Sequence, residues 1–271
     1  MSACGECLTL APTQQQQPLQ PSSTNAPFDM VGIDLFSLRG QQFLVMVDHF
    51  SGLPFVAPLK PTTTKSILSK LSAWFMDFGF PHIIRSDGGP QFRGEFNDFC
   101  KKHGIEKQLS SAYFPQSNGL AESGVKSMKR LLKKVNNNWP KFLEALLHWR
   151  NMPRADGVSP AQMFFGFRQN FGVAEFHNLP RFIDREQAAK ERQLKLRQPA
   201  ANHFNSHARE LPQLQLHDHV RVQDKTSGNW DTSATITEIL PDGRSYLVAD
   251  EHGHSSKRNR RDLRVDASAS L

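Results

Sequence analysis

The stretch IIRSDGGPQFRGEF, residues 83–96, ends a short apolar run with an aspartate and two glycines. A run of β-branched residues that stops at a turn signal is typical of a buried strand. The pattern therefore places Asp87 at the carboxyl end of a strand, and Gly88 and Gly89 leave open space beside its carboxylate. Asp-Gly is also one of the commonest turn pairs, so this stretch alone does not separate a functional acid from an ordinary turn.

The composition is that of a folded and basic protein. Hydrophobic residues make up 38% of the 271 residues, and 33 Lys and Arg oppose 26 Asp and Glu. The net charge of +7 favours a polyanion as the partner. Three cysteines favour a reducing compartment over a disulfide scaffold. Because no signal pattern opens the chain and apolar runs such as FLVMV (43–47) are too short for a bilayer, we expect an intracellular protein without membrane contact.

Periodicity and composition divide the chain into parts. Residues 12–26 are rich in Gln, Pro and Ser and predict a linker, and residues 27–169 predict a mixed α/β domain. We expect its strands at 28–36, 42–50, 54–60, 82–87 and 105–109 and its helices at 64–79, 93–103, 120–135 and 139–150. Residues 170–212 predict a helical or extended linker, residues 213–266 a small β-barrel and residues 267–271 a tail. The basic run KRNRRDLR (257–264) is expected to follow the compact barrel, either as a solvated tail or as a nucleic-acid contact.

Three acids occupy positions that a packed α/β domain does not require. Asp34 interrupts the apolar stretch MVGIDLF, Asp87 ends the strand described above, and Glu122 lies in the first turn of a helix after a turn-rich loop. Each has an ordinary explanation when taken singly, such as a hydrogen-bonded strand acid, a turn acid or the helix dipole. Asp48 in VMVDHF competes with Asp34, but the His-Phe-Ser-Gly that follows it predicts a hairpin corner.

The order and surroundings of these acids resemble the D,D,E catalytic core of retroviral and retrotransposon integrases, most closely the gypsy type of long-terminal-repeat retrotransposon. The strings that carry the resemblance are GIDLF, SDGGPQF, YFPQSNGLAES, WRNMPRADGVSPAQMFFG and WD…TITEILPDGRSYLV…KRNRRDLR. It covers nearly the whole chain and implies a ribonuclease H-like fold. That fold is a mixed five-stranded sheet flanked by helices, followed here by an SH3-like or chromo-like barrel. Thirty-four residues separate Asp87 from Glu122, one fewer than is usual in the family, which puts the loop geometry in question rather than the identity of Glu122.

The implied reaction is phosphoryl transfer, in which the enzyme processes DNA 3′ ends and joins them to target DNA. Two Mg²⁺ or Mn²⁺ ions roughly 3.5–4 Å apart can hold the attacking and leaving oxygens in line. Because Mg²⁺ prefers oxygen ligands and retains several waters, Asp34, Asp87 and Glu122 are predicted to be both the catalytic residues and the metal ligands. Gly88 and Gly89 would leave room for the DNA backbone.

Basic and polar residues near these acids predict DNA contacts. Lys126 and Lys129 lie four and seven residues after Glu122, on the same helix face, and could bind phosphates or simply face solvent. Gln116 and Asn118 precede that helix, where the resemblance implies contact with DNA ends and ordinary turn chemistry is the alternative. Further DNA contacts are predicted at Lys257, Arg258, Arg260 and Arg261.

The pair Cys4 and Cys7 forms C-x-x-C, which is half of a tetrahedral zinc site. The resemblance implies a finger with two histidines ahead of two cysteines, but the first histidine of this chain is His49. We therefore interpret residues 1–11 as the remnant of an N-terminal zinc finger and expect no zinc site within this chain. Cys100 is expected to be a buried helix residue.

The sequence favours a Mg²⁺-dependent DNA integrase that is intracellular and nuclear when it acts on DNA. A catalytically silent, integrase-derived DNA-binding protein is the alternative. Another nuclease with a ribonuclease H-like fold would leave the C-terminal barrel unexplained. The expected partners are DNA, as element ends and as target, and further copies of the chain, with a chromatin contact left open.

Overall fold

The computed structural model describes residues 5–18, 24–109, 119–170, 172, 182–192, 194–195, 198–206, 208–240 and 243–266. The chain forms two compact units: one is Ser22–Gln198, and the other joins Met1–Pro21 to Pro199–Leu271. The division between Gln198 and Pro199 falls inside the predicted linker 170–212. Within the described residues, no helix is both long enough and apolar enough to span a membrane.

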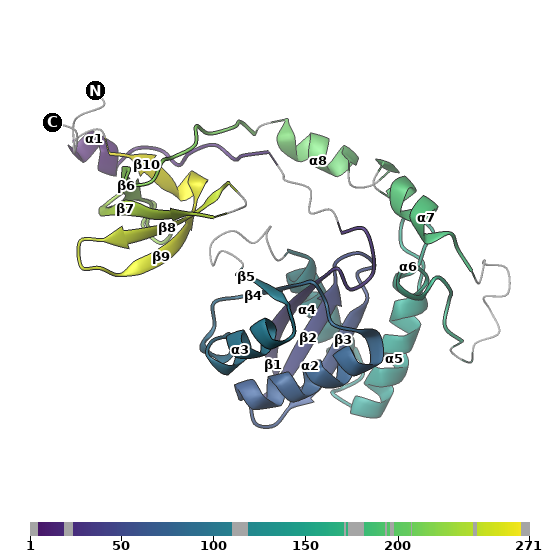
Figure 1. The fold of residues 1–271 in the computed structure, drawn as a ribbon. Coiled ribbons are helices and arrows are strands. Elements are labelled where there is room, and N and C mark those ends of the chain that lie inside the picture. Colours follow the sequence, from purple (N-terminus) through teal and green to yellow (C-terminus); the bar gives the residue numbers. More distant parts are fainter. Residues whose placement is uncertain are drawn as a thin grey trace. The chain divides into compact units, whose positions relative to one another are not determined.

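The unit Ser22–Gln198 combines one sheet with several helices (Figure 1). In chain order they are β1 (Met30–Leu38), β2 (Gln41–Asp48), β3 (Pro54–Leu59), α2 (Thr64–Phe78), β4 (Ile83–Ser86), η1 (Pro90–Phe92), α3 (Glu95–Lys102), β5 (Glu106–Leu109), α4 (Gly119–Lys134), α5 (Trp139–Asn151), α6 (Pro160–Phe165) and α7 (Arg185–Arg192). The sheet order is β3-β2-β1-β4-β5, with β1, β2 and β3 antiparallel and β1, β4 and β5 parallel. The predicted strands and helices up to α5 are confirmed, with ends shifted by a few residues.

Helices cover both faces of this sheet (Figure 1). On one face the core side chains come from α2, α3 and α6: Ile67, Leu71, Phe75, Phe96, Cys100, Ala161 and Phe164. On the other they come from α4 and α5: Met128, Leu132, Phe142 and Leu146. The strands alternate between the two layers, so that Ile33 of β1 faces the first and Phe36 faces the second. Cys100 is buried as predicted, and burial raises the pKa of its thiol to about 11.

Asp48 serves the turn between β2 and β3. Its carboxylate is fully buried and accepts hydrogen bonds from the backbone N–H groups of Phe28 (2.9 Å) and Ser51 (2.7 Å) and from the Ser51 hydroxyl. Burial raises the pKa of Asp48, and these hydrogen bonds offset only part of that rise. The interpretation of Asp48 as a hairpin-corner acid is therefore confirmed.

The other unit is built on an antiparallel sheet with the order β10-β6-β7-β8-β9 (Figure 1). The remaining elements of the chain are α1 (Gly5–Thr9), α8 (Gln198–Asn205), β6 (His219–Val222), β7 (Thr232–Ile239), β8 (Ser245–Asp250), β9 (Ser255–Asn259), η5 (Arg260–Asp262) and β10 (Leu263–Val265). The core of this second unit contains Val220, Ile236, Tyr246, Val248 and Leu263. The second, small all-β unit that the sequence predicts is confirmed as this five-stranded antiparallel sheet.

Two predictions about this unit are wrong. The basic run 257–264 does not follow a compact barrel, because it forms part of β9, all of η5 and the start of β10. Residues 12–18 are not a linker, because they belong to this unit and hydrogen-bond to it. Gln14 Nε2, for example, donates to the carbonyls of Arg261 (2.9 Å) and Leu263 (2.6 Å). Such contacts over more than two hundred residues leave no local signal in the sequence.

Candidate active site

The pairing of β1 with β4 brings two of the predicted acids together. These strands run parallel, and their last recorded pair is Gly32 opposite Arg85. Continued by two residues, the same register places Asp34 opposite Asp87, directly beyond the end of β4. Neighbouring strands lie about 4.8 Å apart, and residues opposite each other point to the same face of a sheet. The two carboxylates therefore start from adjacent backbone positions on one face.

That face is the one covered by α4. In the antiparallel pairing with β2, Asp34 lies opposite Val45, whose side chain packs in the same cluster as Met128 of α4. Gly124 lies close against the sheet, because a Cβ atom added there would be 2.5 Å from Val47 Cγ2. The first turns of α4 thus approach the sheet from the side on which Asp34 and Asp87 lie.

The third predicted acid can be placed only by its backbone. Glu122 lies in α4, two residues before the close contact of Gly124 with the sheet. Its side chain lies outside the described part of the structure, and so do Gln116 and Asn118. The structure therefore brings Asp34 and Asp87 together and places the backbone of Glu122 in the helix that covers them.

The turn after Asp87 is held by hydrogen bonds at its surface. Asp87 is exposed, and its Oδ1 accepts from the Gly89 N–H at 3.0 Å. Arg93 donates to the Gly88 carbonyl through both Nε (3.0 Å) and Nη2 (2.7 Å). Asp34 is half-buried, and its Oδ1 accepts from the N–H of the following residue at 2.7 Å. Sequence reasoning missed Arg93, because its position five residues after Gly88 carries no recognisable signal.

A second basic residue supports this turn from the protein interior. The Lys107 ammonium of β5 donates to the Phe92 carbonyl at the end of η1 and to Asn97 Oδ1 at 2.8 Å. It also lies 5.5 Å from the centre of the Phe96 ring. Burial lowers the pKa of Lys107. Lys107 is thus a positioning residue for the segment that follows Asp87, and the sequence pattern did not indicate it.

The donor set suits a hard divalent cation. Asp34 and Asp87 offer carboxylate oxygens from neighbouring backbone positions, and the exposed position of Asp87 leaves room for water and phosphate ligands. No cluster of three or more His, Cys, Asp and Glu side chains occurs in the described part of the chain, but that part excludes the Glu122 side chain. The geometry accordingly supports a pair of ligands, and the third ligand stays a prediction.

The predicted DNA-binding lysines lie outside the row of α4 residues that packs on the sheet. Lys126 is exposed and Lys129 is half-buried, whereas Gly124, Met128 and Leu132 of the same helix are buried. Helical spacing keeps Lys126 and Lys129 on the face that carries Glu122. Their contact with DNA stays a prediction.

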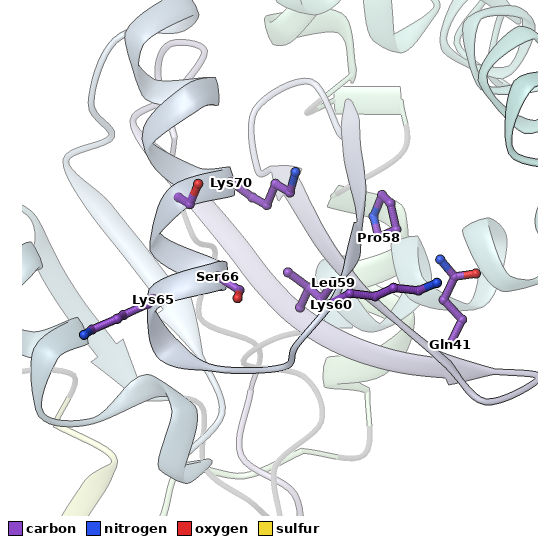
Figure 2. Close-up of a pocket in the computed structure, with 8 residues that line it drawn as sticks. Gln41, Pro58, Leu59, Lys60, Lys65, Ser66 and Lys70 are labelled. Carbon is purple, nitrogen blue, oxygen red and sulfur yellow. The ribbon is translucent and has the colours of Figure 1, made fainter.

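Three other lysines surround a surface groove of about 590 Å³ between the end of β3 and the start of α2. In Figure 2 the side chains of Lys60 and Lys70 extend in the direction in which Gln41 lies, whereas that of Lys65 points the opposite way. Because the ammonium groups do not converge, the groove does not form a built anion site.

The basic residues of the C-terminal unit differ in what they can contact. Arg260 is buried, and its guanidinium donates to the Pro212 and Leu263 carbonyls, so its predicted contact with DNA would require it to leave these partners. Arg261 donates through Nε to the Gln14 carbonyl at 2.9 Å. Lys257 and Arg258 are half-buried on β9, where Arg258 shares the sheet face of the core residue Tyr246. DNA contacts by Lys257 and Arg258 stay predictions.

Only one of the two cysteines of the predicted zinc half-site lies within the described residues. Cys7 is exposed in α1, and Cys4 lies outside the described residues.

Comparison with protein families and curated sequences gives a consistent result. Residues 24–115 match the integrase core domain family. An uncharacterized protein of Caenorhabditis elegans is 31% identical over 175 residues, which cover 60% of this chain and 14% of the relative. The Pol polyprotein of Feline endogenous virus ECE1 is 34% identical over 131 residues, which cover 45% of this chain and 12% of the relative. The Pro-Pol polyprotein of Simian foamy virus type 3 is 30% identical over 178 residues, which cover 63% of this chain and 16% of the relative. The chain thus spans only a small part of the length of these relatives.

Among solved structures, a chain of the simian T-cell lymphotropic virus intasome in complex with PP2A regulatory subunit B56 gamma is similar over 97% of this chain and 87% of its own length. The TM-score is 0.62 and the sequence identity is 17%. At that identity the likeness shows the fold alone. It confirms a ribonuclease H-like mixed sheet together with a second, antiparallel sheet.

Proposed function

Because residues 24–115 match the integrase core domain family, we propose that this chain is an integrase-type polynucleotidyl transferase that processes DNA 3′ ends and joins them to target DNA. The observation that carries the proposal is the register of β1 and β4, which sets Asp34 beside Asp87 on the face covered by α4. An ordinary turn acid at position 87 would not require a second carboxylate opposite it.

In this function Asp34 and Asp87 hold divalent metal, and Glu122 completes the set from α4. Divalent cations held by these carboxylates would stabilise the attacking and leaving oxygens of the phosphoryl transfer. Asp87 presents its carboxylate from a turn that is open beside Gly88, where the nearest atom to an added Cβ would be Arg93 Nη2 at 3.9 Å. The expected room beside Gly89 is taken by the Gln91 side chain, whose Nε2 would overlap a Cβ at that position. Arg93 holds the Gly88 carbonyl, and the Gly89 N–H donates to Asp87 Oδ1 at 3.0 Å, so hydrogen bonds support both the turn and the carboxylate.

The partners follow from the same function. We propose that DNA ends and target DNA bind across the carboxylates, with Lys126 and Lys129 on flanking phosphates. The similar solved chain belongs to an intasome, and we propose that several copies of this chain likewise assemble on DNA ends, in the nucleus.

The test is a strand-transfer assay with matched terminal-repeat ends and Mg²⁺ or Mn²⁺. We expect joining by the parent chain, none by Asp34→Asn or Asp87→Asn, and parent-like joining by the control Asp98→Asn, an exposed acid in the first turn of α3. Calorimetry with Mn²⁺ should give heat with the parent and much less with Asp87→Asn. If the parent binds DNA but never joins ends, the chain is a silent DNA-binding relative and the proposed activity is wrong.

A further inference from the structure

The segment Thr9–Pro18, which begins at the last residue of α1, lies along the C-terminal unit as a strap (Figure 1). The Thr9 carbonyl accepts from the Trp230 backbone N–H at 2.9 Å, and the Ala11 carbonyl accepts from the Trp230 indole Nε1 at 2.8 Å. The Gln14 side chain donates to two backbone carbonyls in η5 and β10. The strap is therefore a built part of this unit rather than a chance contact.

Three arginines point at the strap and bind its backbone oxygens. Arg264 Nη2 donates to the Pro12 carbonyl (2.8 Å), Arg261 Nε donates to the Gln14 carbonyl (2.9 Å), and Arg244 Nη1 donates to the Pro18 carbonyl. The first and last acceptors, Pro12 and Pro18, are six residue steps apart, so the guanidinium groups form a row at most about 20 Å long. Along that length one DNA strand carries a phosphate for about every 3.4 Å of helix axis.

The charge of this row is largely uncompensated. The strap, TLAPTQQQQP, has no charged side chain, so its carbonyls satisfy the guanidinium hydrogen bonds without cancelling their charge. Arg244 pairs with the exposed Glu210 at 2.7 Å, but none of the recorded ion pairs of the described residues joins a carboxylate to Arg261 or Arg264. The neighbouring acids Asp262 and Asp266 pair instead with Lys225 and Arg221.

We propose that Arg244, Arg261 and Arg264 form a latent binding site for DNA phosphodiesters, which the strap occupies with its own carbonyl oxygens and which DNA opens by displacing the strap. A phosphate oxygen is the better acceptor, because hydrogen bonds between a charged donor and a charged acceptor are about twice as strong as neutral ones. The site rests on the proposed function only in taking DNA as its ligand. It requires neither metal nor Asp34 and Asp87.

Trp230 gives a direct measure of strap release. Its side chain is fully buried and its indole N–H is bonded to the Ala11 carbonyl, so hydrogen exchange at that N–H should be slow while the strap is bound. The indole resonance can be assigned with Trp230→Phe. In the whole parent chain, without divalent metal, we expect a DNA duplex to speed this exchange.

Gln14→Ala removes both hydrogen bonds that the Gln14 side chain donates, without altering an arginine. We expect faster exchange at Trp230 and several-fold tighter DNA binding by fluorescence anisotropy, with Gln15→Ala, an exposed neighbour, as the unchanged control. Arg261→Ala should lower the slope of log affinity against log salt by about 0.9 units, the value of one phosphate contact. If exchange at Trp230 stays slow in Gln14→Ala, the strap has not been released, and a chain lacking residues 1–18 is used instead. That chain should likewise show faster exchange at Trp230 and tighter DNA binding.

Two results would overturn the latent site. One is a released strap, seen by exchange, with DNA affinity unchanged. The other is tight DNA binding by the parent with no acceleration of Trp230 exchange. A chain whose strap is released by DNA but which does not join DNA ends would contradict the proposed activity alone. Failure of the latent site and failure of the proposed function are therefore distinguishable.

Discussion

Replacing Gly124 by alanine tests whether α4 must lie directly on the sheet for the active site to work. The added Cβ would be 2.5 Å from Val47 Cγ2, whereas carbon atoms pack best at about 3.5–4.0 Å. Val47 is buried and β-branched, so it cannot rotate away cheaply. The helix must therefore move outward by roughly 1 Å. Glu122 lies two residues earlier in the same helix and would move with it.

The stability and activity of this variant should change by different amounts. Overpacking costs about 1–3 kcal/mol, and alanine recovers about 1 kcal/mol through its higher helix propensity. The free energy of unfolding should therefore fall by only about 0–2 kcal/mol. A displacement of about 1 Å at a catalytic group can cost roughly 10²-fold in rate, so strand transfer should fall far more than stability.

The assay compares urea unfolding with strand transfer at a temperature where every variant is folded. Ser123→Ala, at the exposed neighbouring position, is the control and should behave as the parent. Combining Gly124→Ala with Val47→Ala removes the clashing atom and should restore much of the joining rate, although the core is weakened. Full strand transfer by Gly124→Ala, or no recovery in the double variant, would refute the placement of Glu122 by this contact.

Other variants test the charges around the fold and the site. Asp156→Asn leaves a buried guanidinium, that of Arg192, without its counter-charge and should lower the unfolding free energy by about 3–5 kcal/mol, measured in urea. Burial raises the pKa of Asp156, but the hydrogen bond and charge of Arg192 lower it by more, so this stability is present above pH 3.8 and is lost as pH falls through the lower folded pKa. A parent-like pH profile in the variant would contradict that. Lys126→Ala with Lys129→Ala should weaken DNA binding and reduce the salt slope by about one unit per lost phosphate, with Mn²⁺ heat unchanged. An unaltered slope would make these lysines ordinary surface residues. Arg93→Lys keeps the charge but loses the two-donor contact, so joining should fall by up to about 10²-fold while DNA affinity holds. Full joining by this variant would remove Arg93 from the positioning role.

Features of the fold that depend on local patterns could be predicted from the sequence. The short apolar run before Asp87 is a strand, and the apolar spacing of Ile67, Leu71 and Phe75 predicts the buried face of α2. The short helix α6 could also have been found. Ser159 caps it in a capping box with Gln162, and Gly166 ends it in the left-handed conformation, which is a recognisable sequence signature.

Contacts between distant parts of the chain could not be predicted in this way. KRNRRDLR has the composition of a solvated basic segment, yet Arg260 is buried because two carbonyls satisfy its guanidinium. The glutamine-rich strap has the composition of a linker, yet Gln14 bonds to backbone groups some 247 residues away. Lys107 supports the turn after Asp87 from another strand. In each case the partner is a backbone carbonyl, and every residue has one, so no residue type marks the contact.

The register of the sheet limits how the site can vary. Side chains alternate along a strand with a period of two, so a one-residue deletion between Gly32 and Asp34 would turn the Asp34 carboxylate away from α4 and into the apolar layer of Ile33. A one-residue change in the loop between β5 and α4 has no such effect, because α4 is fixed to the sheet by Gly124, Met128 and Leu132 rather than by the loop that precedes it. The fold therefore constrains the spacing within β1 strictly and the spacing from Asp87 to Glu122 only loosely. This explains physically why a loop one residue shorter than usual is compatible with Glu122 as the third acid.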